Sequence, residues 1–178
     1  MKKYTQPIFI KILRIFWVII WFIFCKFTPP LFPFNTWRVL ILKIFGAKID
    51  WSSKIYPSAK IFMPWNLIMK KNSCLGKNVD CYNYDKIFIF QNSIISQNSF
   101  LCTASHRYDS KNFELIRAPI TIKEKVWVAA NCFVAPGIMM EKESVLLANS
   151  NLTKNTKKNS VYAGNPAKFK KKGIKFLI

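Results

Sequence analysis

The chain contains a single histidine, His106, which is the strongest candidate for acid–base chemistry. An imidazole with an ordinary pKa of about 6.5 can take a proton at neutral pH and return it afterwards, so it suits a general base. His106 comes directly before an irregular segment, residues 107–117, which we expect to be a loop that leaves the body of the protein. Functional residues are common on loops held by a rigid scaffold. Because a lone histidine is more often structural, its role depends on the elements around it.

The five cysteines show no recognisable metal-binding or disulfide pattern. No two form a CxxC pair, and one histidine cannot complete a zinc site with them at a familiar spacing. They are better interpreted as small buried apolar residues in a reducing compartment, and no cleavage site for a signal peptide is seen. The sequence therefore predicts a cytoplasmic protein without a metal. The cysteines are Cys25, Cys74, Cys81, Cys102 and Cys132.

The chain is strongly basic, with 28 Lys and Arg against 8 Asp and Glu and a net charge of +20. Such a charge favours an anionic partner: a membrane surface, a nucleic acid or a phosphorylated ligand. Solubility alone is the alternative explanation. The charge gathers at the two ends, because neither the first 49 residues nor the segment from Lys154 onward contains an acidic residue. No familiar nucleic-acid-binding motif is present, so we do not expect nucleic acid as a partner.

Residues 8–25 form an almost wholly apolar segment that Lys11 and Arg14 interrupt. A membrane-spanning helix needs about 20 apolar residues, which this segment barely reaches. Basic residues beside Trp17 and Trp21 favour a helix that lies in the membrane interface. A helix packed on the protein's own body is the third interpretation, and the sequence leaves all three open.

The segment that follows contains two further elements. Pro29, Pro30 and Pro33 should end any helix and form a rigid, extended link. Residues 37–45 are typical of a short amphipathic helix closed by Gly46.

Beyond Gly46, apolar residues recur every six positions, and this period organises most of the chain. It fits neither a helix nor a simple strand alternation. It fits a triangular coil in which three short strands and three corners make one turn. Two slips of two residues and one gap divide the pattern. The anchor residues are Ile49, Ile55, Ile61, Leu67, Leu75, Cys81, Ile87, Ile89, Ile95, Leu101, Ile122, Val128, Val134, Met140, Leu146 and Leu152.

Small residues and asparagines mark the predicted corners of this coil. Four positions after an anchor a small residue is frequent, because the wall bends inward there. Glycine is scarce, and asparagine, which tolerates the left-handed backbone region, takes its place. The small residues are Ser53, Ala59, Ser93, Ser99, Ser105, Cys132, Ser144, Ser150 and Thr156; the asparagines are Asn66, Asn72, Asn78, Asn92, Asn98 and Asn131.

Several segments within about residues 35–172 resemble the hexapeptide-repeat acetyltransferases, and within that family the colanic-acid-type O-acetyltransferases of polysaccharide biosynthesis. The resemblance implies an all-β fold, a left-handed parallel β-helix, over residues 47–163 with a loop inserted at 107–117. It leaves an N-terminal hydrophobic helix and linker in residues 1–46 and a basic tail in residues 164–178. The matching segments are Trp37–Arg38, Phe45–Ile49, Pro64–Leu67, Ser96–Gln97, Leu101–His106, Ala118–Ile122, Val126–Ala130, Ala135–Gly137 and Val161–Lys168.

This resemblance also implies an activity. The family moves an acetyl group from acetyl-CoA directly to a sugar hydroxyl during surface polysaccharide synthesis, and His106 matches its general base. No cysteine falls at a nucleophile position, so Cys102 should be a wall residue. Related proteins commonly carry an acidic residue after this histidine, where Arg107 stands here. Asp109 or a backbone carbonyl could orient the ring instead.

The resemblance implies binding residues as well. Ala130 and Ala148 match small residues that line the pantetheine groove of CoA, and Asn83 matches an asparagine on the acceptor side. The remaining CoA positions are Thr153, Lys154, Lys168 and Lys171, of which the last two match basic residues near the adenosine phosphates; a solvated tail is their alternative interpretation.

The same family implies a homotrimer with active sites between subunits. The acceptor would be a sugar or oligosaccharide, and a lipid-linked one would explain peripheral membrane contact through residues 8–25 at the inner face of the membrane. Two alternative functions stay open. One is an acyltransferase with a non-sugar or amine acceptor, and the other is a non-catalytic, membrane-associated scaffold. A γ-type carbonic anhydrase is excluded, because it needs three histidine ligands.

Overall fold

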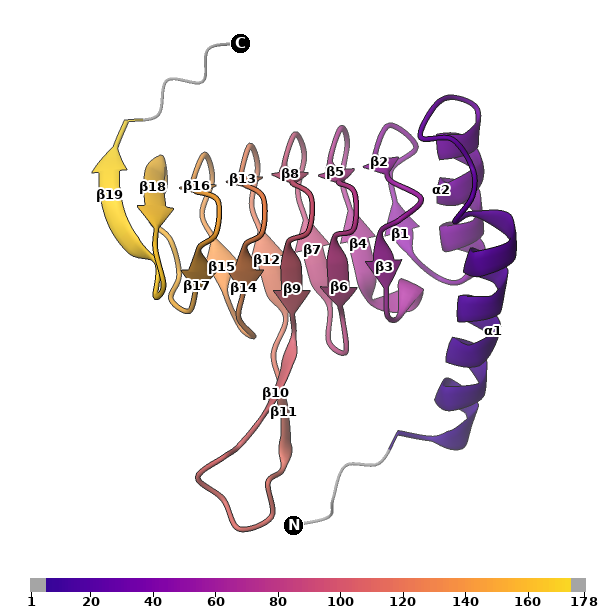
Figure 1. The fold of residues 1–178 in the computed structure, drawn as a ribbon, viewed down its shortest axis with the longest axis horizontal. Coiled ribbons are helices and arrows are strands. Elements are labelled where there is room, and N and C mark those ends of the chain that lie inside the picture. The colour runs from indigo at the N-terminus through magenta and orange to yellow at the C-terminus, as the bar shows by residue number, and fades with distance from the viewer. Residues whose placement is uncertain (1–5, 174–178) are drawn as a thin grey trace.

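Three sheets, parallel except for the last strand of the second, form the sides of a prism in the computed structural model, which describes residues 6–173 (Figure 1). Residues 1–5 and 174–178, the ends of the expected N-terminal segment and basic tail, lie outside the described residues. The first sheet contains β1 (Lys48–Ile49), β4 (Leu67–Met69), β7 (Ile87–Ile89), β12 (Ile120–Ile122) and β15 (Met139–Met140). The second contains β2 (Lys54–Ile55), β5 (Cys74–Leu75), β8 (Ile94–Ile95), β13 (Trp127–Val128), β16 (Val145–Leu146), β18 (Ser160–Ala163) and β19 (Lys168–Lys172). The third contains β3 (Lys60–Ile61), β6 (Asp80–Tyr82), β9 (Phe100–Cys102), β14 (Phe133–Val134) and β17 (Asn151–Leu152).

The axis of the prism is filled by the anchor residues. Every predicted anchor is 5% exposed or less, which confirms the period of six. Burial of one Leu, Ile or Val side chain contributes about 1.5–3 kcal/mol, so the stacked anchors are the main source of stability.

The two slips in the period have a structural cause in the first sheet. Strands β4 and β7 each contribute two inward residues instead of one, Leu67 with Met69 and Ile87 with Ile89. The coils that end on these strands contain twenty residues, since Lys48 pairs with Ile68 and Ile68 with Phe88. Strand β12 also turns two residues inward, but its Thr121 pairs with Met139 only eighteen residues on. The prism therefore keeps its register while the sequence period shifts.

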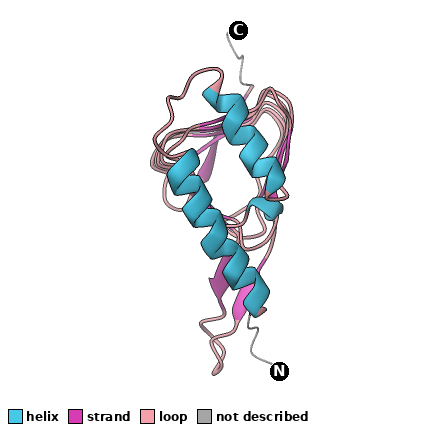
Figure 2. Ribbon diagram, turned by 90° about the vertical axis from the view of Figure 1, so that its right-hand side faces the viewer, coloured by secondary structure: helices cyan, strands magenta, loops and turns pink. Residues whose placement is uncertain are grey.

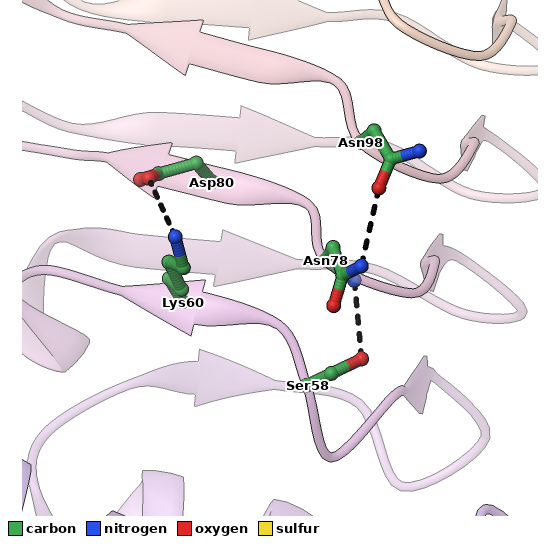
Figure 3. A network of polar contacts seen from close by, with 5 residues as sticks. All are labelled: Ser58, Lys60, Asn78, Asp80 and Asn98. Carbon is green, nitrogen blue, oxygen red and sulfur yellow. Dashed lines mark hydrogen bonds and ion pairs between the residues drawn. The ribbon is translucent and has the colours of Figure 1, made fainter.

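The corners follow the predicted chemistry with two exceptions. Asn72, Asn78, Asn92, Asn98 and Asn131 have φ between 54° and 59°, as expected of asparagine in place of glycine. The backbone N–H of Asn78 donates to Ser58 Oγ at 3.1 Å, and its side-chain amide donates to Asn98 Oδ1 at 3.2 Å, so the corners form a polar ladder along the prism (Figure 3).

The exceptions are Asn66 and Ser105. Asn66 ends the 3₁₀ helix η1 (Pro64–Asn66), and its amide donates to the carbonyls of Asn83 and Tyr84, both at 3.1 Å. Ser105 is exposed, because the chain has already left the prism wall at this point. The other predicted small residues are all buried.

Two helices, α1 (Ile8–Phe24) and α2 (Phe34–Ile44), cover the N-terminal end of the prism (Figure 2). Trp17 is 1% exposed, and its indole N–H donates to the carbonyl of Ile61 at 2.6 Å, so α1 packs on the protein's own body. None of the helices within residues 6–173 is long and apolar enough to cross a bilayer.

The connection between these helices differs from the extended link that its prolines predict. It is a succession of turns, because the chain must reverse direction between α1 and α2. Helix α2 begins at Phe34 instead of Trp37, since Pro33 is compatible with the start of a helix. Buried Arg38 ties the three parts together: its Nε donates to the carbonyl of Ile55 at 2.8 Å, and its Nη1 donates to Thr28 Oγ1 at 2.7 Å.

The C-terminal end is closed by a β-strand that the sequence suggested only as a basic tail. Strand β19 pairs antiparallel with β18, with Ser160 opposite Lys172 and Ala163 opposite Lys168. Its residues are exposed, so this end of the prism presents lysines to solvent.

Candidate active site

His106 lies on an antiparallel hairpin that leaves the prism between β9 and β12 (Figure 1). The hairpin is formed by β10 (Ala104–His106) and β11 (Leu115–Arg117), with His106 opposite Leu115. The expectation of an irregular loop over residues 107–117 is therefore wrong for its last three residues. Strand pairing holds the histidine more firmly than a loop would.

The imidazole of His106 is exposed and fixed by Phe113. Its Nδ1 lies 2.9 Å from the backbone carbonyl oxygen of Phe113, and the two rings stack with centroids 4.5 Å apart and planes 7° apart. A carbonyl oxygen only accepts hydrogen bonds, so Nδ1 carries the hydrogen. In the neutral ring, the lone pair is then on Nε2. Of the two orienting groups considered, the structure shows the backbone carbonyl.

Phe113 adopts an unusual backbone conformation to make this contact. Its φ is +46°, a region that a bulky residue rarely occupies. Such conformations persist only where the surroundings enforce them, and they cluster at functional sites. Turn bonds provide that enforcement here: Phe113 N–H donates to the carbonyl of Ser110 at 3.1 Å, and Arg107 N–H donates to the carbonyl of Glu114 at 2.9 Å.

The carboxylate of Glu114 contributes to the order of the hairpin tip. A hydrogen bond from the Ser110 hydroxyl, followed by one from the backbone, lowers the pKa of Glu114. The side-chain amide of Asn112 also approaches its Oε1, at 3.5 Å.

Ala130 and Ala148 lie above one another on a single edge of the prism. Ala130 is in the corner between β13 and β14, and Ala148 is in the equivalent corner between β16 and β17. The N–H of Asn149 donates to the carbonyl of Ala130 at 3.0 Å, which joins the two corners directly. Ala148 is exposed and Ala130 half-buried, so the backbone along this edge has little side-chain cover.

The four remaining predicted CoA positions are exposed and fall into two groups. Thr153 and Lys154 follow β17, on the edge between the third and first sheets. Lys168 and Lys171 lie on β19, opposite Ala163 and Val161. Lys168 follows a turn that is joined to the alanine edge, because Gly164 N–H donates to Ser150 Oγ at 3.0 Å.

Asn83 has a buried amide that bonds the polypeptide. Its Oδ1 accepts from the N–H of Met63 at 2.9 Å, and its Nδ2 donates to the carbonyl of Met63 at 2.6 Å. The residue exposes no surface, so an acceptor would have to open these bonds to reach it. The acceptor contact inferred from the resemblance stays a prediction.

These positions do not converge within one chain. The His106 hairpin leaves the edge between the third and first sheets, where Thr153 and Lys154 also lie. Ala130 and Ala148 occupy the edge between the second and third sheets. One side of the prism thus separates the histidine from the alanines.

Two contributors were missed from the sequence. Phe113 carried no signal, because neither its stacking nor its positive φ follows from local residue types. Trp127 is partly exposed beside the alanine edge, and its indole N–H donates to Ser96 Oγ at 2.9 Å. Trp127 falls in the segment Val126–Ala130, whose resemblance to the family was the only signal for it, whereas Phe113 lies outside every matching segment. Within residues 6–173, no group of three or more His, Cys, Asp or Glu could hold a metal ion.

Comparison with known proteins places this architecture among the hexapeptide-repeat acetyltransferases. A maltose O-acetyltransferase from Clostridium difficile superposes with a TM-score of 0.83 at 22% identity, over 97% of this chain and 92% of that one. A galactoside acetyltransferase in complex with coenzyme A gives a TM-score of 0.83 at 22% identity, over 95% and 84% of the chains. These similarities establish the left-handed β-helix fold.

The sequence relatives define the family. The chain is 42% identical over 131 residues to the putative colanic acid biosynthesis acetyltransferase WcaF of Escherichia coli, covering 74% of this chain and 72% of the relative. It is 26% identical over 134 residues to the galactoside O-acetyltransferase of Escherichia coli, covering 74% and 66%. No family model matches. The chain belongs to the family of colanic acid biosynthesis acetyltransferases.

Proposed function

We propose that this acetyltransferase moves an acetyl group from acetyl-CoA to a sugar hydroxyl during synthesis of a surface polysaccharide: an exopolysaccharide, a capsule or an O-antigen. The observation that carries the proposal is the contact between His106 Nδ1 and the carbonyl of Phe113, because it leaves Nε2 as the basic atom on an exposed hairpin. The colanic acid and galactoside relatives support a sugar as acceptor.

The proposed reaction is a direct transfer. Nε2 of His106 removes the proton of the acceptor hydroxyl while the hydroxyl oxygen attacks the thioester carbonyl carbon. The new C–O bond forms, the C–S bond breaks, and the imidazolium returns its proton to the departing thiolate. The products are the acetyl ester and the free thiol of CoA. Throughout, the Phe113 carbonyl accepts from Nδ1 and stabilises the positive charge on the ring.

The donor site is proposed on the alanine edge. The small side chains of Ala130 and Ala148 leave backbone groups within reach of a pantetheine chain, and Lys168 and Lys171 supply positive charge for phosphates. Thr153 and Lys154 are proposed to act at the same donor. Lysine attracts phosphate as a point charge, without the two-pronged geometry of arginine.

A homotrimer is proposed because His106 and the two donor-site alanines, Ala130 and Ala148, lie on different edges, with Thr153 and Lys154 on the histidine edge. Packing the histidine edge of one prism beside the alanine edge of another would bring the two halves of the site together, and a cyclic trimer repeats this contact three times. We also propose that the enzyme works in the cytoplasm, at the inner face of the membrane, where a lipid-linked sugar would be presented.

The activity is tested by release of the CoA thiol from acetyl-CoA over a panel of nucleotide sugars and lipid-linked oligosaccharides. His106→Ala should lower turnover by about 10²–10⁴-fold while CoA affinity stays near normal. Tyr108→Ala is the matched control, since this side chain is 89% exposed on the same hairpin. Wild-type turnover in His106→Ala, or no transfer to any sugar, contradicts the proposal.

The shared site is tested by mixing two inactive variants. Ala148→Arg should block the donor edge, and His106→Ala removes the base. If the site lies between subunits, exchanging subunits between the two variants restores part of the activity. If each chain contains a whole site, the mixture stays inactive.

A further inference from the structure

The N-terminal end of the prism presents a broad apolar surface. It comprises the outward sides of α1 and α2 and the linker between them, and we call it the end plate. Figure 2 views this end directly and shows both helices lying across it. Its exposed members include Phe9, Phe16, Phe22, Phe27, Phe32 and Ile44, of which Phe32 is 85% and Phe27 73% exposed. Soluble surfaces rarely expose apolar side chains in such continuity without a partner.

The end plate is rigidly attached to the prism. The inward side of α1 is buried through Trp17 and Trp21, whose rings stand 5.1 Å apart, and Trp17 also contacts Phe45 at 5.2 Å. Because α1 lies across the end of the prism, its outward side faces away along the prism axis. The helix is therefore held flat, which is the orientation of helices that lie in a membrane interface.

The linker and α2 add a hollow to this surface. It has a volume of about 540 Å³, and its lining includes the apolar side chains of Phe32, Trp37, Leu40 and Trp51. Aromatic residues such as tryptophan favour the boundary between water and lipid.

The charges on the end plate specify the partner. Residues 1–49 contain no acidic side chain. Lys26 is exposed, with its Nζ 4.9 Å from the ring centre of Phe22 and 5.7 Å from that of Phe27, so its cation stands among the apolar residues. Lys11 is likewise exposed, and Lys43 places its Nζ 4.9 Å from the ring of Trp51. A second copy facing this surface would bring like charges together, whereas anionic lipid headgroups would neutralise them.

We infer that the end plate binds an anionic membrane and that the prism stands end-on upon it. This inference rests on the proposed membrane attachment and is independent of the acetyl transfer. The apolar side chains enter the headgroup boundary, and the lysines remain at the level of the lipid phosphates.

The orientation sets the height of the candidate active site. Strands β3, β6 and β9 are consecutive neighbours in the third sheet, and the hairpin leaves the prism after β9. Two strand spacings of about 4.8 Å and one helix layer of about 10 Å place the base of the hairpin about 20 Å from the membrane. At this height the enzyme would meet a sugar carried by a lipid, rather than the lipid itself.

The inference is tested by co-sedimentation with vesicles made of phosphatidylcholine alone or mixed with phosphatidylglycerol. The full chain should bind the mixed vesicles, and added salt should weaken the binding. The plate variant Phe9→Glu/Phe32→Glu should bind at least about tenfold more weakly. The matched control Tyr108→Glu/Phe169→Glu makes the same change in net charge at exposed aromatic residues outside the plate, and should bind like the wild type.

Each other outcome has a definite meaning. If the wild type does not bind the mixed vesicles, both the proposed membrane attachment and the proposed role of the end plate are wrong. If the wild type binds but both double variants weaken equally, overall charge carries the binding and the end plate fails. If the plate variant instead halves the particle mass in lipid-free light scattering, the plate is a contact between copies of the chain. Acetyl transfer to a water-soluble acceptor, measured in parallel, shows whether the proposed activity stands in any of these cases.

Discussion

The Nδ1 atom of His106 lies 2.9 Å from the carbonyl oxygen of Phe113, and the phenyl ring of the same residue covers the imidazole with centroids 4.5 Å apart. One residue thus fixes both the tautomer and the plane of the candidate base. The β10–β11 pairing also fixes the backbone of His106, which lies opposite Leu115. The orientation of the ring is consequently set by the hairpin itself and not by a neighbouring acidic side chain.

Replacing Phe113 separates its two contributions. Phe113→Leu keeps the carbonyl but removes the aromatic face, and stacking of this kind contributes about 0.5–1.5 kcal/mol. We expect kcat to fall about two- to tenfold, with little change in the KM for acetyl-CoA. Phe113→Tyr should restore kcat, since it keeps the ring. Steady-state kinetics of both variants provide the test, and a wild-type kcat in Phe113→Leu would show that the stack does not position the base.

Most of the scaffold was predictable because its period is enforced by the core. In a narrow prism, an apolar residue at every sixth position can be buried only along the axis. Leu67, Leu75 and Val128 accordingly have no exposed surface. What the period did not explain was the pair of slips. They fall at strands β4 and β7, where the coils contain twenty residues instead of eighteen, and the length of a coil depends on packing against its neighbours.

Substitutions at Asn78 measure how much an asparagine at a corner contributes to stability. Its φ is +56°, a conformation that costs most L-residues about 1–2 kcal/mol. Asn78→Ala should therefore lower the free energy of unfolding by about that amount. Asn78→Gly loses the bond to Asn98 but relieves the backbone, so it should cost less (Figure 3). Urea denaturation at one fixed protein concentration compares them. Equal losses would show that the amide bond, not the backbone, explains this residue.

The candidate site was less predictable than the scaffold, and the reason is long-range geometry. Residue type singled out His106, but the contact with Phe113 needs a hairpin whose register no local pattern specifies. Asn83 is the opposite case, because its match to the family predicted more than the structure shows. It matched an acceptor-side residue, yet its buried amide forms hydrogen bonds with the backbone of Met63. Matching a family position does not reveal which partners a side chain already has.

The carboxyl of Asp80 predicts a pH-dependent stability. Burial raises its pKa above the ordinary value of 3.8, while the ammonium of Lys60, 4.0 Å away, acts in the opposite direction (Figure 3). The folded state then holds this proton more tightly than the unfolded state, so stability falls as pH rises through that range. Asp80→Asn should raise Tm at pH 7, and its advantage should vanish in acid, below the ordinary pKa.

Lys60→Gln is the matched variant for Asp80, because removing the cation should lower Tm at pH 7. Thermal unfolding at the two pH values measures both changes. A lower Tm for Asp80→Asn at pH 7 would mean that the ion pair outweighs the cost of burial.

The five cysteines should be unreactive in the native protein. Burial raises the pKa of each thiol, to about 12 for Cys25, so almost no thiolate exists near pH 8. We expect Ellman's reagent to modify the native chain slowly and to modify all five cysteines at once after denaturant is added. Because the pKa of Cys25 in the folded protein is so high, raising the pH to 9 should not make this thiol react with the reagent.

Cys74 is only half-buried and should be the first cysteine to react, and Cys74→Ser should remove that first reaction. Fast labelling of more than one thiol in the native protein would contradict this burial. If labelling is slow, the thiol detected during turnover comes from CoA alone.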